Sequence, residues 1–335
     1  MTGSSTDTGH WSKDGDSCTV PASCFEGILR EATGHHCRVL EVEPYAGPRG
    51  RNILFLETRT GLGQVERLVV KRFLFGQAEE DFQAECRGLE LGGDAGLLVP
   101  HTHAVCSGFD NQLEAPFIIM SRLSGSELVR QRTSSAVLGA LDEVEASLLR
   151  LYSAYHDASR DAPGPGPRLM PERLGYYASE CRGPLVSNDR AAAADQLQQL
   201  AEDLVEWYET EGEALTRCPV NFVHGDLDTS NLLVCDDGRV GFIDWQERRW
   251  RSSWEEIAYY AARTLRCVVP DVRKASALLV DKCASCFGDD SLPLRFRYYL
   301  GARILETSYR AATEWERYDI VDGLLGKCMP ALDRD

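Results

Sequence analysis

Three residues with oxygen-bearing side chains follow one another at short intervals in the second half of the sequence. Asp226 stands five residues before Asn231, and Asp244 follows thirteen residues after Asn231, with apolar stretches between them. Transfer of a phosphoryl group requires a base near the attacking hydroxyl and oxygen ligands for Mg²⁺, which neutralises the phosphates. The spacing therefore predicts one base, Asp226, and two metal ligands.

A second pair of charged residues lies in the first third of the chain. Lys71 is surrounded by apolar residues in a stretch with strand composition, and Glu85 follows fourteen residues later on a predicted amphipathic helix. Such a lysine can reach the α- and β-phosphates of a nucleotide while the carboxylate holds its ammonium in place. Glu79 and Glu80, on the same predicted helix, are alternative partners for the lysine.

The elements that must position these residues change in type along the chain. Before a hinge-like break at 123–125, the patterns predict helices at 22–32 and 77–91, the second ended by the glycine pair 92–93, and strands at 38–43, 53–58, 67–73, 102–106 and 116–121. After the break they predict mostly helices, interrupted by strand runs at 220–224 and 231–244. Strands first and helices later are typical of an α+β protein.

The chain is long enough for two domains. Its 335 residues exceed the roughly 100 to 200 residues of a usual single domain. We expect a disordered leader at residues 1–17, an N-terminal nucleotide-binding lobe at 18–121, and a helical C-terminal lobe at 122–335. The C-terminal lobe would carry the catalytic loop and the acceptor site.

Composition and charge exclude several classes of partner. The net charge of -16 argues against nucleic acid and against an anionic membrane surface, because both require a basic footprint. No apolar run reaches the roughly 18 residues that span a bilayer, and the polar N-terminus lacks the apolar region of a secretory signal. We therefore expect a cytoplasmic protein without nucleic-acid or membrane partners.

The 12 cysteines are scattered through a chain that is too long to need disulfide staples. In the reducing cytoplasm we interpret them as small core or surface residues. Cys283 and Cys286 have the spacing of a zinc pair, but no second pair completes four ligands. We interpret these two as neighbours on one helix.

The whole order of motifs resembles a known family. A strand lysine, a helix glutamate, a hinge, His-x-Asp-x-x-x-x-Asn and Ile-Asp-Trp follow one another, and the resemblance runs from about Arg38 to Leu265. In this respect the chain is similar to the aminoglycoside phosphotransferase and choline kinase-like family, the small-molecule relatives of protein kinases. The resemblance implies a protein-kinase-like two-lobe fold of the α+β class, with an N-terminal antiparallel sheet lobe and a larger helical lobe.

The resemblance also implies a role for each matching residue, with Mg²⁺ as cofactor and ATP or GTP as co-substrate. His224 would buttress the catalytic loop rather than react. The implied roles are catalytic base for Asp226, Mg²⁺ ligands for Asn231 and Asp244, a phosphate-positioning pair for Lys71 and Glu85, and an adenine-binding hinge for Met120, Ser121 and Leu123.

The chain departs from the family pattern in two places. The stretch from Tyr45 to Asn52 occupies the place of the phosphate-covering loop without a regular G-x-G-x-x-G. Glu256 begins a Glu-Ile-Ala sequence where many members have Asp-Leu-Ala, so the loop-bracing role of that acid is left open.

Two rival functions share the fold. A protein kinase is disfavoured because only about eight residues separate Asp244 from the helix predicted near Ser253, too few for a peptide-docking segment, and because Gly225 replaces the arginine that grips a phosphorylated loop. No protein substrate is therefore expected. A non-catalytic pseudokinase is disfavoured because the lysine, the base and both metal ligands are all present.

The acceptor is predicted to be a hydroxyl of a small molecule, and its class stays open. Carboxylates in the stretch 202–213 would suit a cationic aminoglycoside. Arg248, Arg249 and Trp250 would suit a planar neutral or anionic acceptor, such as a nucleoside-type antibiotic, and Asp228 is a further candidate contact. The family resemblance implies an antibiotic-modifying kinase, for resistance or self-protection of a producer. A kinase of a choline-like or sugar-like metabolite is the alternative.

Overall fold

The computed structural model describes residues 20–45, 52–74, 78–131, 134–155, 171–216, 220–245, 249–287 and 292–332. The chain divides into two compact units. The first contains Met1–Leu89 and Pro100–Leu123, and the second contains Glu90–Val99 and Ser124–Asp335. That the short segment Glu90–Val99 belongs to the second unit was not predicted from the sequence.

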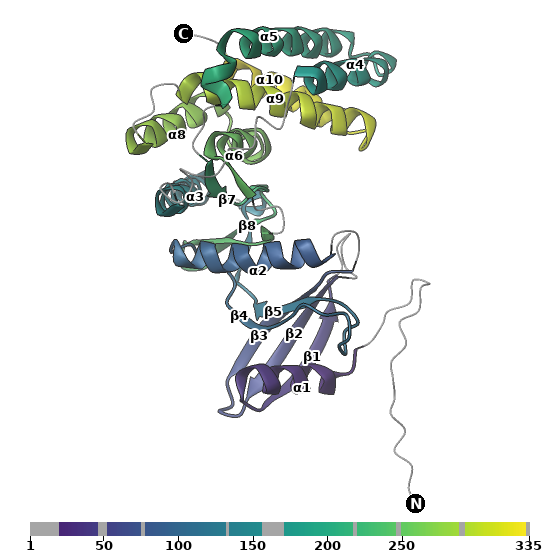
Figure 1. Cartoon of the computed structure of the whole chain (residues 1–335), viewed down its shortest axis with the longest axis vertical. Helices are drawn as coiled ribbons and strands as arrows, with labels where there is room; N and C mark the ends of the chain where they lie inside the picture. Colours follow the sequence, from purple (N-terminus) through teal and green to yellow (C-terminus); the bar gives the residue numbers. More distant parts are fainter. Residues whose placement is uncertain are drawn as a thin grey trace, which may run out of the picture. The chain divides into compact units, whose positions relative to one another are not determined.

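The first unit is built on an antiparallel sheet of five strands in the order β1-β2-β3-β5-β4. Helix α1 (Ala22–Thr33) packs on one face of the sheet, where its Phe25 and Leu29 join alternate strand residues in a buried core (Figure 1). The strands are β1 (Cys37–Pro44), β2 (Ile53–Thr60), β3 (Val65–Arg72), β4 (Thr102–Cys106) and β5 (Phe117–Ser121).

Helix α2 (Ala78–Asp94) differs from the prediction at its C-terminal end. The expected stop at the glycine pair 92–93 is wrong, because the helix continues through both residues. Gly92 is needed for space: a Cβ atom there would lie 2.8 Å from the ring of the buried Trp245. The glycine therefore allows close packing against the indole and does not cap the helix.

The second unit is mainly helical. Helices α4 and α5 lie side by side and both pack against α9 (Figure 1). Helix α4 was not predicted from the sequence, and it contains Pro184 in its interior; its first residue, Pro171, takes the position where a helix tolerates proline best. The helices are α3 (Ser134–Tyr155), α4 (Pro171–Ser187), α5 (Ala191–Thr216), α6 (Ser253–Tyr260), α7 (Arg266–Val268), α8 (Val272–Phe287), α9 (Leu292–Thr313) and α10 (Tyr318–Lys327).

Short segments of other helix types complete the unit. A π-helical segment, Ala261–Leu265, joins α6 to α7, and 3₁₀ turns occupy Leu128–Arg130 and Met329–Leu332. No helix in the described ranges is both long and apolar enough to cross a membrane.

Two small sheets in the second unit flank the loop that carries Asp226. Strands β6 (Gly125–Glu127), β8 (Leu232–Cys235) and β9 (Val240–Phe242) form one sheet in the order β6-β8-β9. Strands β7 (Val220–Val223) and β10 (Arg249–Ser252) form the other. Strands β6 and β10 were not predicted from the sequence, but the predicted α+β class with an antiparallel N-terminal sheet is confirmed.

Candidate active site

The loop between β7 and β8 carries the predicted base and is folded into a tight turn. Gly225 has φ of 89°, a left-handed conformation that residues with a side chain rarely adopt. The amide of Asp228 donates to the carbonyl of Asp226 at 2.8 Å, and the amide of Asn231 donates to the carbonyl of Asp228 at 3.0 Å. The buried Leu227 anchors the turn. Backbone hydrogen bonds and the buried Leu227 thus help to hold the loop conformation.

Asp226 and Asn231 are in direct contact. The Asn231 amide nitrogen donates to the backbone carbonyl of Asp226 and to its carboxylate oxygen Oδ2, both at 2.9 Å. Because the nitrogen is committed to Asp226, the amide oxygen of Asn231 is turned away from that carboxylate. The turn therefore presents the side-chain oxygen of Asn231 in a fixed orientation.

Asp244 lies at the end of the neighbouring strand. Strands β8 and β9 pair with Leu232 opposite Phe242, and beyond them the amide of Ile243 donates to the carbonyl of Asn231 at 3.1 Å. Asp244 has φ of 66°, a strained conformation for a residue other than glycine, of the kind that clusters at functional sites. The pairing brings Asn231 and Asp244 to the same end of the hairpin.

Two aromatic residues hold this strand end in place. Trp245 is fully buried, its indole N–H donates to the carbonyl of Phe242 at 3.2 Å, and its ring stacks on Phe222 with 6.0 Å between centroids. A buried tryptophan directly after Asp244 fixes the backbone on which the carboxylate stands. The oxygen donors of Asn231 and Asp244 fit a Mg²⁺ ion, which is a hard cation and prefers oxygen ligands.

His224 links the loop to the same strand end. It is fully buried, its Nδ1 accepts from the amide of Asp226 at 3.3 Å, and its Nε2 lies 3.0 Å from the carbonyl of Ile243. Because Nδ1 accepts a hydrogen bond, the proton belongs on Nε2, which donates to the carbonyl. These contacts suit the buttressing role that the family resemblance implied.

Glu256 on α6 braces the loop from the other side. Its Oε1 accepts from the amide of Gly225 at 2.6 Å, and its Oε2 accepts from the hydroxyl of Tyr152 at 2.8 Å. Burial and the charge of Glu256 raise the pKa of Tyr152 well above its ordinary value, so the phenol stays protonated and donates. The bracing contact that the sequence left open is therefore made by a glutamate.

We expect Glu256→Ala to destabilise the protein by about 3 kcal/mol, because it leaves two buried donors, Gly225 N–H and Tyr152 O–H, without this acceptor. Urea unfolding measures the change. Tyr152→Phe removes one donor and leaves the Gly225 contact intact, so its effect should be smaller. An alanine variant as stable as the parent chain would show that the brace is not needed for folding.

Two residues of the site were missed by the sequence analysis. The hydroxyl of Tyr259 donates to Oδ1 of Asp226, and the guanidinium of Arg263 contacts Oδ2 of Asp228 through Nε at 3.0 Å and an Nη nitrogen at 2.8 Å. Burial, together with the charge of Asp226, raises the pKa of Tyr259, although Arg263 acts in the opposite direction. In the sequence, Tyr259 and Arg263 stand only four residues apart, about one helical turn. That spacing does not show which residues they contact.

The candidate acceptor contacts are only partly visible. Asp228 forms the ion pair with Arg263, and both side chains are largely buried. Arg248 lies outside the described residues. Arg249 and Trp250 belong to β10, opposite Val223 and Phe222, but their side chains are not described.

In the first unit, Lys71 and Glu85 form the predicted pair. The Lys71 ammonium lies 2.7 Å from the Glu85 carboxylate, with side chains 11% and 1% exposed. Glu79 and Glu80, the alternatives left open by the sequence, are exposed. The structure thus favours Glu85 as the partner of the lysine.

Lys71 stands on the sheet face opposite the α1 core. Strand register aligns Phe55 with Val69 and Val69 with Met120, and these three residues lie outside the core cluster. Side chains on a strand alternate between faces, so Val69 and Lys71 share one face. An apolar surface beside the Lys71 ammonium suits a nucleotide, whose nucleobase is apolar on its faces and whose phosphates are anionic.

The predicted hinge begins where β5 ends. Met120 is buried, the amide of Ser121 donates to the carbonyl of His101, and the amide of Arg122 donates to the carbonyl of Arg67, both at 2.8 Å. Within the described ranges the Leu123 amide makes no backbone hydrogen bond. That amide is therefore available to a ligand.

We expect Glu85→Gln to raise the KM for the nucleotide by about tenfold, equivalent to about 1.4 kcal/mol, because a neutral amide holds the Lys71 ammonium less firmly. Steady-state kinetics with varied nucleotide measure the effect. Glu80→Gln, the same change at an exposed position of the same helix, is the control. Equal KM values for the two variants would exclude a positioning role for Glu85.

Taken together, a sheet unit with a buried Lys–Glu pair and a helical unit with an Asp–Asn–Asp loop define a protein-kinase-like phosphotransferase fold. The chain belongs to the phosphotransferase enzyme family, whose model matches residues 43–277, more than half of its length. The resemblance stated from the motifs is confirmed. No curated protein matches the chain by sequence.

Solved structures with the same fold include aminoglycoside phosphotransferases. The chain is similar to one from Alicyclobacillus acidocaldarius, with a TM-score of 0.64 and 14% identity over 96% of each chain. It is also similar to APH(4)-Ia, with a TM-score of 0.56 and 17% identity over 93% of this chain and 98% of that one. A thermostable mutant of APH(4)-Ia bound to AMP-PNP and hygromycin B has a TM-score of 0.55 and 17% identity, over 92% of this chain and 97% of that one. At these identities the similarity concerns the fold.

Proposed function

We propose that the chain is a kinase of small molecules that transfers the γ-phosphate of ATP or GTP to a hydroxyl of an antibiotic-type acceptor. The observation that carries this proposal is the joint placement of Asp226, Asn231 and Asp244 at one end of the β8–β9 hairpin. Membership of the phosphotransferase enzyme family supports it.

In the proposed reaction, the carboxylate of Asp226 orients the acceptor hydroxyl and takes its proton as the oxygen attacks the γ-phosphorus. The bond from that phosphorus to the β–γ bridging oxygen breaks, and the nucleoside diphosphate leaves. Asn231 and Asp244 would hold Mg²⁺, which supplies positive charge to the phosphates when it is bound. Lys71, paired with Glu85, would hold the α- and β-phosphates, and the Leu123 amide would meet the nucleobase. A related structure that contains AMP-PNP supports a nucleoside triphosphate as co-substrate.

For the acceptor, we favour a neutral or anionic compound, such as a nucleoside-type antibiotic. The carboxylate of Asp228, two residues from the base, is neutralised by Arg263 and so attracts an ammonium group weakly. The same guanidinium lies 5.5 Å from the ring centre of Trp315, which is 39% exposed. A half-exposed indole beside a cation suits a planar acceptor better than a polyamine.

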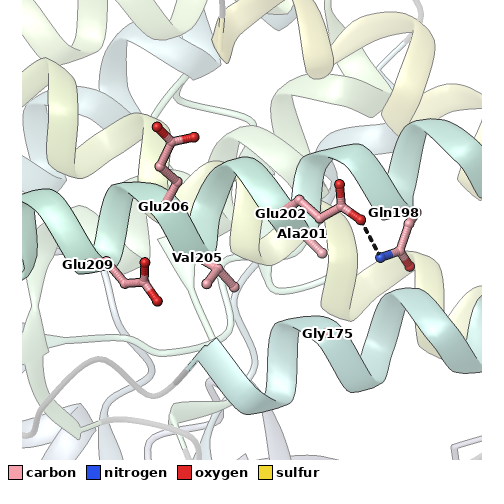
Figure 2. Close-up of a pocket in the computed structure, with 7 residues that line it drawn as sticks. All are labelled: Gly175, Gln198, Ala201, Glu202, Val205, Glu206 and Glu209. Carbon is pink, nitrogen blue, oxygen red and sulfur yellow. Dashed lines mark hydrogen bonds between the residues drawn. The ribbon is translucent and has the colours of Figure 1, made fainter.

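A cationic aminoglycoside is the second candidate, favoured by an acidic groove in the second unit. The groove, of about 290 Å³, lies between α4 and α5. Figure 2 shows Glu202, Glu206 and Glu209 along α5, and the dashed line marks the hydrogen bond from Gln198 to Glu202. Hygromycin B, bound to a protein of the same fold, belongs to this class of acceptor.

A panel of acceptors tests the proposal. Purified protein, Mg²⁺ and ATP or GTP would be incubated with nucleoside and peptide antibiotics, aminoglycosides including hygromycin B, choline and simple sugars. Mass spectrometry would detect the gain of one phosphate. We expect modification of a neutral or anionic antibiotic. Modification of an aminoglycoside would favour the second candidate, and modification of choline or a sugar alone would replace the antibiotic function with a metabolic one.

A further inference from the structure

Both carboxylate oxygens of Asp226 accept hydrogen bonds, and the two donors come from different parts of the second unit. Asn231, in the same loop, donates to Oδ2 at 2.9 Å. Tyr259, at the end of α6, donates to Oδ1 through its hydroxyl. A carboxylate turns easily about its last side-chain bond. One donor leaves that rotation partly open, whereas two donors on opposite oxygens stop it.

Two arginine guanidiniums lie against the ring of Tyr259. The guanidinium carbon of Arg263 lies 5.8 Å from the Tyr259 ring centre, and that of Arg303 lies 5.3 Å from it. Arg303 is buried and bound by the carboxylates of Glu255 and Glu306. The ring therefore has little freedom to move away from the base.

The segment that follows Tyr259 is tied to the same loop. Residues Ala261–Leu265 form a π-helical turn, a local distortion that is frequent at functional sites. The hydroxyl of Thr264, within this turn, donates to the carbonyl of Leu227 at 2.7 Å, and Arg263 holds Asp228. The end of α6 and the π-helical turn thus contact three successive loop residues, Asp226, Leu227 and Asp228.

A purely structural explanation is that a partly buried phenol needs a hydrogen-bond partner and Asp226 happens to supply one. The next residue argues against it. Tyr260 is fully buried in the same helix, yet its hydroxyl makes no hydrogen bond within the described residues. Burial at the end of α6 therefore does not by itself lead a phenol to a partner.

We infer that Tyr259 is a positioning residue, which fixes the carboxylate of Asp226 in the orientation that receives the acceptor proton. The inference rests on the proposed function, in which Asp226 is the base. Without the Tyr259 hydroxyl, the carboxylate samples orientations that do not face the acceptor. The rate then falls while nucleotide binding is kept, because the phenol touches the base and not the nucleotide sites assigned above.

The test compares Tyr259→Phe with Tyr260→Phe, two identical changes at adjacent positions of α6. The probe is Mg-ATP with water as the acceptor, and release of labelled phosphate is followed in single turnovers with protein in excess. We expect Tyr259→Phe to lower the rate constant at least ~10-fold with an ATP Kd within about twofold of the parent chain. Tyr260→Phe should keep the parent rate.

A Tyr259→Phe rate within twofold of the parent chain would overturn the inference. So would equal losses of rate in both phenylalanine variants, since these would indicate general damage to α6. Asp226→Asn, measured in parallel, separates this result from the proposed function. If Asp226→Asn is inactive and Tyr259→Phe is not, only the positioning role fails. If Asp226→Asn keeps the parent rate, the assignment of the base itself fails.

Discussion

Replacing Asp226 by asparagine or alanine is expected to lower turnover by at least ~10²-fold, because general-base and orienting contributions are about 10² to 10⁴-fold. Asn231 and Tyr259 hold the two oxygens of this carboxylate, so the group is fixed before an acceptor arrives. Asparagine keeps the size of the side chain but cannot take a proton from the acceptor. Steady-state kcat, measured with a phosphorylated acceptor or with water, gives the result.

Nucleotide affinity should stay close to that of the parent chain in the same variants, since the proposed nucleotide contacts lie elsewhere. Asp237→Asn provides a matched control. Asp237 is an exposed aspartate in the β8–β9 turn, where its carboxylate pairs with Arg239. Turnover of the Asp226 variants equal to that of Asp237→Asn would remove Asp226 from its role.

The proximity of Asp226, Asn231 and Asp244 could be predicted from the sequence because their geometry is local. Asp226 and Asn231 belong to one turn, and a hairpin of two short strands returns the chain to Asp244. In such a hairpin, spacing along the sequence nearly determines spacing in space. The same holds for the sheet of the first unit, whose strands pair mostly with their sequence neighbours.

The groups that support the site could not be found in this way. Glu256 and Tyr259 contact loop residues that lie 31 and 33 positions earlier in the sequence. Both stand on α6, which follows β10, and the direction of this helix decides which of its residues face the loop. Neither side chain has an unusual sequence context. Their contacts result from packing between elements, which a pattern of residue types along the chain does not encode.

The glycine pair 92–93 illustrates a different limit. A glycine pair after an amphipathic segment commonly ends a helix, and the sequence analysis applied that rule. Here the requirement for a small residue comes from Trp245, more than a hundred positions later, which leaves no space for a side chain at Gly92. A helix end and close tertiary packing both favour glycine, and only the structure distinguishes the two causes.

Replacing Asp244 by alanine is expected to abolish Mg²⁺-dependent nucleotide binding and turnover together. The carboxylate stands at the end of β9 in a strained backbone conformation, with φ of 66°. Trp245 on one side and the Ile243–Asn231 hydrogen bond on the other hold it next to the second predicted ligand. Alanine removes the only charged oxygen donor of the predicted pair, so the metal-dependent part of nucleotide affinity should disappear.

Calorimetric titration of ATP in the presence of Mg²⁺ and in the presence of EDTA measures that part directly, without relying on turnover. In the parent chain the two affinities should differ by a large factor, and in Asp244→Ala they should coincide. Asp236→Ala, at an exposed aspartate of the same hairpin, should keep the difference. Asp226→Asn should also keep it while losing turnover, because the base is proposed to act on the acceptor and not on the metal. An Asp244→Ala variant that retains the full metal dependence would mean that Asp244 is not a ligand, and the strained backbone at this residue would then need another explanation.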